Sequence, residues 1–299
     1  LTTGSKTVTI NYNNASGCSA LSATSSTATN VTGPTATAGA ALTAICSGGT
    51  SAAMGGSVGG TATGGTWSGG TGTWTNATNP STATYTAGAS ESGTVTLTLT
   101  TSGGACGTTT ATKNITVNAR PTVTFTAQPG ASACANTDVT YTTQSGQSNY
   151  VWTVPGVLNT DYSITSGGIG TSSNTVTLRW LTTGSKTVSV NYTNASGCSA
   201  ASATSSTATT VNARPTVTFT AQAGASACTN TNVTYTTQSG QSNYVWGVPG
   251  VLNTDYTIIS GGIGTSSNTV TLRWLTTGSK TVTINYNNAS GCSALSATS

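Results

Sequence analysis

Residues 117–123 read Val117-Asn118-Ala119-Arg120-Pro121-Thr122-Val123, and residues 211–217 repeat the same seven letters at an offset of 94. The match extends far beyond this stretch, since residues 117–205 and 211–299 differ at only ten of 89 positions. Self-similarity at a fixed period is typical of modules joined in tandem. The chain therefore contains two copies of one module, each opened by a short Asn-Ala-Arg-Pro linker.

A second, longer period includes the first residues of the chain. Residues 1–25 are identical to residues 275–299, whereas the matching part of the middle copy, 181–205, differs at Ser189, Val190, Thr193 and Ala201. We expect a super-repeat of 274 residues and interpret the chain as a window cut from a longer array. The predicted parts are 1–30, the C-terminal part of a truncated module; 31–116, a Gly/Thr-rich module; 117–210, a complete module; and 211–299, a module lacking its last strand.

The composition predicts an all-β protein. Of the 299 residues 4% are charged, while 71 are Thr and 37 are Gly. Amphipathic helices need many more charged residues, whereas Thr, Val and Tyr favour half-buried strands and Gly, Ser and Asn favour turns. A Ser/Gly/Thr bias also occurs in disordered linkers. The alternation of apolar and polar residues along 94–100 is typical of a strand and argues against disorder.

Within the complete module, apolar residues alternate with Thr, Ser and Asn in short segments separated by Gly and Pro turns. Six or seven short antiparallel strands in about 94 residues indicate an immunoglobulin-like β-sandwich. We expect Trp and Tyr residues on these strands to form the cores, and Pro in the short linkers to make the array a semi-rigid rod. The predicted core residues are Trp152, Trp246, Trp180, Trp274, Tyr192 and Tyr286.

The seven cysteines predict three disulfides. The module boundaries sort six of them into Cys46 with Cys106, Cys134 with Cys198, and Cys228 with Cys292, the last two pairs at equal spacing. Cys18 is left over and is unpaired by truncation, because its position matches Cys198 and Cys292. Persistent disulfides imply an oxidising compartment. Metal binding is the alternative, although two thiols per module without His fall short of a zinc site.

Catalytic and cofactor chemistry is not expected. The chain has no His, and its four acids, Glu91, Asp138, Asp161 and Asp255, are far apart. The net charge of +4 comes from scattered basic residues, so nucleic acid is not an expected partner. No apolar stretch approaches the length of a membrane span, so we expect no membrane insertion of this segment. We predict neither an enzyme nor a resident metal.

Three sets of residues have both a functional and a structural interpretation. Asp161 and Asp255 could each supply one calcium ligand, but capping of a turn is favoured because each module offers only one or two acids. Lys6, Lys186 and Lys280 could form isopeptide bonds, or protect a sheet edge as solvated lysines. Trp67 and Trp74 could form a platform for sugars, although core or cross-strand packing is favoured.

A resemblance to a known family rests on three stretches. Residues 150–156 (Tyr-Val-Trp-Thr-Val-Pro-Gly), 164–168 with 174–178, and 188–192 with Ser196-Gly197-Cys198 resemble the PKD-like domain. Residues 65–74 are similar to another Ig-like repeat of the same proteins. Such domains occur in tandem in giant secreted cell-surface proteins of Bacteroidota, including gliding adhesins exported by type IX secretion.

The repeats and the resemblance together predict a non-catalytic structural role. We expect the repetitive stalk of a large extracellular adhesin at a bacterial cell surface. The expected partners are adjacent modules of the same chain. A self-assembling filament, with lateral copies as partners, and a glycan-binding module, with surface glycans as partners, remain the alternatives.

Overall fold

The computed structural model describes residues 3–170, 172–264 and 266–299. Across these ranges the chain has strands, turns and bends and no helix, which confirms the predicted all-β class. The chain forms two compact units, Leu1–Thr122 with Thr193–Ala201, and Val123–Tyr192 with Ser202–Ser299. The first unit therefore contains one loop, residues 193–201, that the sequence assigns to the following module.

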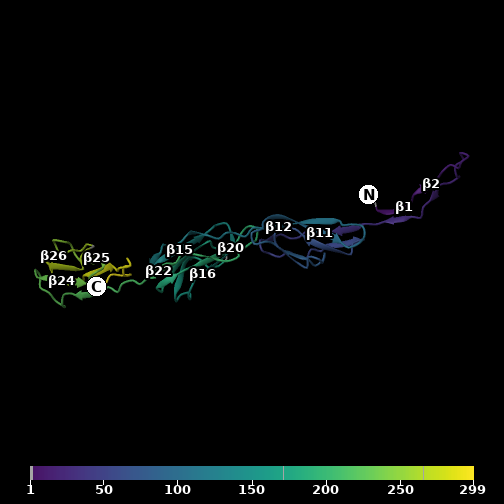
Figure 1. Cartoon of the computed structure of the whole chain (residues 1–299). Coiled ribbons are helices and arrows are strands. Elements are labelled where there is room, and N and C mark those ends of the chain that lie inside the picture. The colour runs from purple at the N-terminus through teal and green to yellow at the C-terminus, as the bar shows by residue number, and fades with distance from the viewer. Residues whose placement is uncertain (1–2, 171, 265) are drawn as a thin grey trace. The chain divides into compact units, whose positions relative to one another are not determined.

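The Gly/Thr-rich module is folded around a four-stranded sheet. Its strand order is β6 (Ile45–Cys46), β12 (Thr110–Asn118), β11 (Gly93–Ser102) and β8 (Gly64–Ser68). The long β11 and β12 run side by side in Figure 1. Two short antiparallel pairs complete it, β5 (Pro34–Thr37) with β7 (Ser57–Gly60), and β9 (Thr73–Thr75) with β10 (Thr84–Thr86).

Glycine allows close packing inside this module. Gly70 has a φ of +72°, and a Cβ there would overlap the hydroxyl of the fully buried Tyr85. Every second residue of β11, from Val95 to Leu99, is buried, while the intervening Thr residues lie on the other face. The Gly-rich sequence is thus part of a packed core.

The N-terminal segment is a ribbon of short strand pairs. β1 (Gly4–Lys6) pairs with β4 (Thr29–Val31), and β2 (Thr9–Ile10) pairs with β3 (Thr24–Ser25), all four being exposed. Val8 and Tyr12 are 72% and 75% exposed, whereas the matching Val188 and Tyr192 are 0% and 3% exposed. The ribbon therefore exposes side chains that the complete module buries.

The complete module is a sandwich of short sheets. One sheet has the order β13 (Phe125–Ala127), β15 (Asp138–Thr143), β18 (Thr175–Trp180), β17 (Tyr162–Gly167). A second contains β16 (Ser148–Thr153), β20 (Ser189–Thr193) and β21 (Thr204–Ser205). A third contains β14 (Ser132–Cys134), β22 (Thr209–Asn212) and β19 (Gly184–Lys186).

The last module repeats the first two of these sheets. β23 (Phe219–Ala221), β24 (Asn232–Thr237), β27 (Thr269–Trp274) and β26 (Tyr256–Gly261) form one, and β25 (Ser242–Gly247) pairs with β28 (Thr283–Asn287) in the other. The structure describes no strand at 226–228 or 278–280, where the complete module has β14 and β19.

The aromatic residues lie in the module cores. In the complete module Phe125 packs against Trp152, with ring centroids 6.0 Å apart, and Tyr150 packs edge-on against Tyr192 at 5.7 Å. Tyr162 packs in the same way against Trp180, at 5.8 Å. The six aromatic residues expected in the cores are all buried: Trp152, Trp246, Trp180, Trp274, Tyr192 and Tyr286.

Candidate functional site: the junction between successive modules

The last strand of each of two modules pairs with a short strand that ends in a cysteine. The end of β12 runs parallel to β6, with Asn118 opposite Cys46. The end of β22 runs parallel to β14 in the same register, with Asn212 opposite Cys134. Because Ala119-Arg120-Pro121 and Ala213-Arg214-Pro215 follow directly, the cysteine lies beside the start of the linker in both modules.

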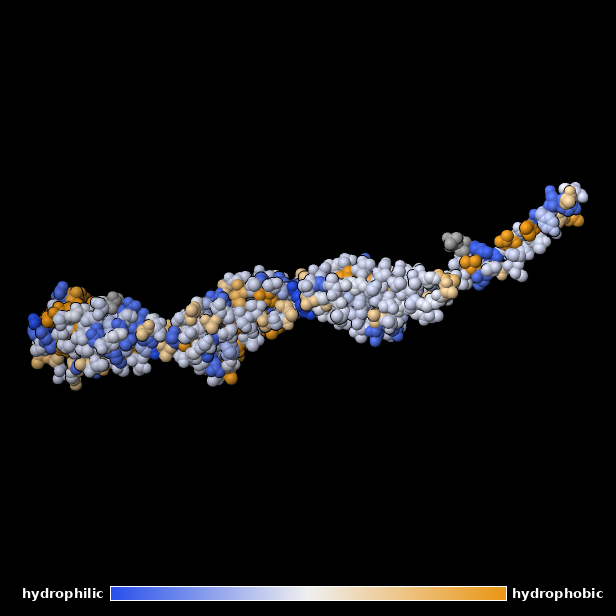
Figure 2. All heavy atoms as spheres, in the orientation of Figure 1, coloured by the Kyte–Doolittle hydropathy of each residue, from blue (hydrophilic) through white to orange (hydrophobic). Residues whose placement is uncertain are grey.

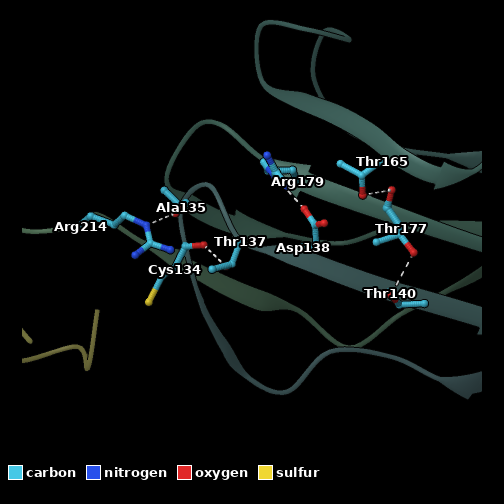
Figure 3. Close-up of polar contacts among 9 residues, drawn as sticks. All are labelled: Cys134, Ala135, Thr137, Asp138, Thr140, Thr165, Thr177, Arg179 and Arg214. Atoms are coloured by element: carbon cyan, nitrogen blue, oxygen red, sulfur yellow. Dashed lines mark hydrogen bonds and ion pairs between the residues drawn. The ribbon is translucent and has the colours of Figure 1, made fainter. Parts of the chain in front are cut away.

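The linker arginine joins two backbone segments. The Nε of Arg214 donates to the carbonyl of Ala135 at 2.6 Å, and its Nη1 donates to the carbonyl of Ser293 at 2.7 Å. Figure 3 shows Arg214 reaching Ala135 next to Cys134. Ala135 follows one junction cysteine and Ser293 follows another, so the guanidinium, which carries several N–H donors in a fixed plane, connects the two cysteine-bearing segments.

The other junction has the same arrangement. The Nε of Arg120 donates to the carbonyl of Ser47 at 2.8 Å, and its Nη1 donates to the carbonyl of Ser199 at 2.8 Å. Ser47 and Ser199 are again the residues directly after cysteines. The arrangement therefore belongs to the linker motif and is independent of the module that precedes it.

An asparagine holds the second cysteine of each junction in place. The Oδ1 of Asn194 accepts hydrogen bonds from the backbone amides of Ser196 and Cys198, and its Nδ2 donates to the carbonyl of Ala119 at 3.0 Å. Asn288 makes the corresponding bonds around Cys292 and reaches the carbonyl of Ala213 at 2.9 Å. The side chain thus fixes the turn and ties it to the linker.

Two disulfides complete the junctions. Cys46 is bonded to Cys198 and Cys134 to Cys292, with Cα–Cα distances of 5.8 and 5.6 Å. Cys198 and Cys292 are 0% and 1% exposed. Each bridge therefore connects a module to a loop of the module that follows it in sequence.

This pairing corrects the predicted one, which put Cys46 with Cys106, Cys134 with Cys198 and Cys228 with Cys292. β12 separates the first of these pairs: Cys46 lies beside its last residue, while Cys106 precedes its first. A nine-residue strand is about 27 Å long at roughly 3.4 Å per residue, far beyond the reach of a disulfide. Cys18, Cys106 and Cys228 are exposed and outside any disulfide.

The two candidate calcium ligands cap turns. The carboxylate of Asp161 accepts from the amide of Val157 at 2.8 Å and from the hydroxyl of Thr182 at 3.1 Å. These two hydrogen bonds hold the pKa of Asp161 below its usual value, with a small contribution from Lys186. Asp255 has the equivalent contacts and a pKa lowered for the same reasons. In the described part of the chain no three His, Cys, Asp or Glu side chains gather in a way that could hold a metal ion.

The remaining candidates contribute to packing. Trp67 is 2% exposed, donates from its indole nitrogen to the carbonyl of Pro80 and stacks on Trp74 at 6.0 Å, so the pair does not form an open sugar platform. Lys186 donates to Thr182 and lies over the Trp180 ring at 5.4 Å, and Lys280 lies over Trp274 at 5.6 Å. These half-buried lysines cover core aromatics.

One buried cation was not singled out from the sequence. Lys113 on β12 is 9% exposed and donates from Nζ to the carbonyls of Met54, at 2.6 Å, and Ala40, at 2.8 Å. Its ammonium lies 5.6 Å from the centroid of the Trp67 ring, and burial lowers its pKa. Nothing in the sequence distinguishes it from an exposed lysine, except that it alternates with Thr on a long strand.

The comparisons with known proteins give weak similarities only. No family model matches the chain, and no curated protein matches it. A solved titin I9–I11 tandem is 10% identical, with a TM-score of 0.31, over 87% of this chain and 97% of that one. Eight N-terminal Ig domains of the Down syndrome cell adhesion molecule are 12% identical, with a TM-score of 0.37, over 97% and 42%.

The Escherichia coli adhesin FdeC is also similar, being 15% identical with a TM-score of 0.30 over 88% of this chain and 95% of that one. The chain's own sheets define an all-β array of tandem modules, each built from short, mostly antiparallel sheets. Among the residues that the structure describes, no helix is long and apolar enough to cross a bilayer.

Proposed function

We propose that the chain is the structural repeat region, a stalk, of a large extracellular cell-surface adhesin, and that it has no catalytic activity. The observation that carries this proposal is the junction. Each one combines a disulfide, a bridging arginine and an asparagine at the same positions, so the linker is built to couple neighbouring modules. A stalk needs such coupling, because it must transmit force from one module to the next.

Other properties of the chain agree with a location outside the cell. Disulfides persist in oxidising compartments, and the structure has two of them, each with one buried cysteine. The PKD-like resemblance extends the proposal to a secreted bacterial protein of the gliding-adhesin type, with adjacent modules of the same chain as its partners.

The experiment that tests the stalk is electron microscopy of chains with one, two and three super-repeats. We expect threads one module wide whose length grows in proportion to the number of super-repeats. Threads several chains wide would favour the filament instead. The purified chain should also bind neither cells nor arrayed glycans, because a stalk leaves recognition to another domain.

Glycan binding has no support from Trp67 and Trp74, the pair considered as a sugar platform, since Trp67 is buried.

A further inference from the structure

The complete module is crossed by two short covalent paths. The first path enters through the Cys46–Cys198 disulfide, follows residues 198–212 and leaves through the second linker. The second path enters through the first linker, follows residues 120–134 and leaves through the Cys134–Cys292 disulfide. Each junction is therefore crossed twice, once by a peptide linker and once by a disulfide.

Hydrogen bonds hold segments 120–134 and 198–212 side by side. The hydroxyl of Thr204 donates to the carbonyl of Val123 at 2.8 Å, and further along both segments the hydroxyl of Thr209 donates to the carbonyl of Gly130 at 2.9 Å. The partners are 81 and 79 positions apart, so the two segments advance together in the same direction. They end in the parallel pairing of β14 with β22.

The remaining residues of the module, 135–197, contain most of its hydrophobic core. They include four residues that are 0% exposed: Val176, Leu178, Val188 and Val190. Figure 2 shows hydrophobic atoms on the visible surface of the chain only in scattered patches, as expected when such residues lie inside. Residues 135–197 also connect Cys134 with Cys198, so they form a third connection between the same two junctions.

Length distinguishes these three connections. Segments 120–134 and 198–212 contain about 15 residues each and reach at most about 50 Å when fully extended. Both already include strands, in which the chain rises by roughly 3.3 Å per residue, so they store little extra length. Residues 135–197 would reach about 210 Å. The two short segments therefore become taut long before the core connection does.

We propose that segments 120–134 and 198–212 together carry the tension along the array, so that the oxidised module does not lengthen under load and its core bears none of the force. Tension that arrives through a linker and a disulfide passes to the next disulfide and linker without crossing residues 135–197. Unfolding of the core then leaves the distance between the two junctions unchanged. The inference deepens the proposed stalk function and rests on it for the source of the tension.

The two paths also replace each other when one disulfide is lost. If Cys46–Cys198 is reduced, the second path still joins the first linker to Cys292, and if Cys134–Cys292 is reduced, the first path still joins Cys46 to the second linker. The array lengthens at this module only after both disulfides are reduced, when the tension passes to residues 135–197.

The first experiment pulls the full, oxidised chain by two points on the first path in single-molecule force spectroscopy. The handles are attached through azide-bearing residues introduced at the exposed positions of Thr43 and Thr216. The route from Thr43 across Cys46–Cys198 to Thr216 contains about 23 residues, so the handles should separate by no more than about 80 Å at any force that leaves covalent bonds intact.

Two cysteine variants give this measurement its contrast. In Cys198→Ser the shortest route between the handles contains about 170 residues, so the maximum separation should rise about sevenfold, to about 580 Å. Cys134→Ser is the matched control and should stay at about 80 Å, because it leaves Cys46–Cys198 intact. A wild-type separation well beyond that value, no gain in Cys198→Ser, or a gain in Cys134→Ser would overturn the proposal.

The second experiment determines whether the core bears force. Trp152→Ala destabilises the core of the complete module, and Val190→Ala does so with fewer atoms removed. Mass spectrometry first confirms both disulfides in each variant. The oxidised variants should give the wild-type force–extension curve between the same handles, whereas after reduction they should unfold at lower force than the wild type. An oxidised variant that lengthens at lower force than the wild type contradicts the proposal.

This proposal and the stalk function fail separately. An oxidised chain that lengthens refutes the tension-bearing segments and leaves the stalk in place. Threads several chains wide in electron microscopy refute the stalk and leave the pulling result unchanged.

Discussion

The overlapping disulfides make a quantitative prediction for a chain pulled by its two ends. The shortest covalent route from Leu1 to Ser299 runs to Cys46, crosses to Cys198, returns along the chain to Cys134 and crosses to Cys292. It contains about 120 residues, so the fully unfolded, oxidised chain should extend to about 400 Å, against about 1,000 Å after reduction. Single-molecule force spectroscopy measures both lengths.

Single cysteine variants then separate this pairing from one within modules. Cys292→Ser leaves only Cys46–Cys198, which lengthens the route by about 30 residues, or about 100 Å. Cys228→Ser should change nothing, because Cys228 is outside any disulfide. If Cys228 were instead bonded to Cys292, either substitution would release about 64 residues, or about 220 Å. A gain of that size in Cys228→Ser would refute the pairing described here.

Three further predictions concern stability. Lys113→Met removes the hydrogen bond to the buried Met54 carbonyl, and the free energy of unfolding should fall by about 1–3 kcal/mol in denaturant titrations. Asp161 and Asp255 have lowered pKa values in the folded state, so the stability that they contribute is fully present above their ordinary pKa of 3.8 and is lost as the pH falls through the lowered value. Melting temperatures should therefore be flat from neutral pH to about pH 5 and fall below about pH 4, less steeply in Asp161→Asn. Arg214→Met removes two hydrogen bonds beside the Cys134–Cys292 disulfide, so a small thiol should reduce that disulfide about tenfold faster, as followed by mass spectrometry. Arg179→Met is the control: it breaks an exposed ion pair with Asp138 and should leave the rate of reduction unchanged.

The strands could be predicted from the sequence because their burial alternates. Thr94 to Thr100 reads as polar and apolar residues in turn, and the structure places this segment in β11 with Val95, Leu97 and Leu99 buried. The aromatic core of the complete module could be predicted from the same alternation, since Trp152 and Trp180 occupy buried positions of β16 and β18.

The junction could not be predicted in the same way. In a periodic chain, equally spaced cysteines are compatible with a disulfide inside each module and with a disulfide to the next module, because both disulfide patterns repeat at the same offset. What decides between them is the position of Cys46 at the end of β12, and this depends on the parallel pairing of Asn118 with Cys46, which alternation along a single strand does not reveal. The sequence shows an arginine in each linker, but the two carbonyls to which Arg120 donates, each directly after a cysteine, are visible only in the structure.

The two bridges overlap in sequence, and this has a consequence for damage by proteases. Cys46–Cys198 and Cys134–Cys292 share the interval from Cys134 to Cys198, so one cut in the peptide chain anywhere from Cys46 to Cys292 leaves its two fragments joined. Bridges confined to single modules would leave the linkers as places where one cut severs the molecule. A chain nicked by a protease at either linker therefore still holds together.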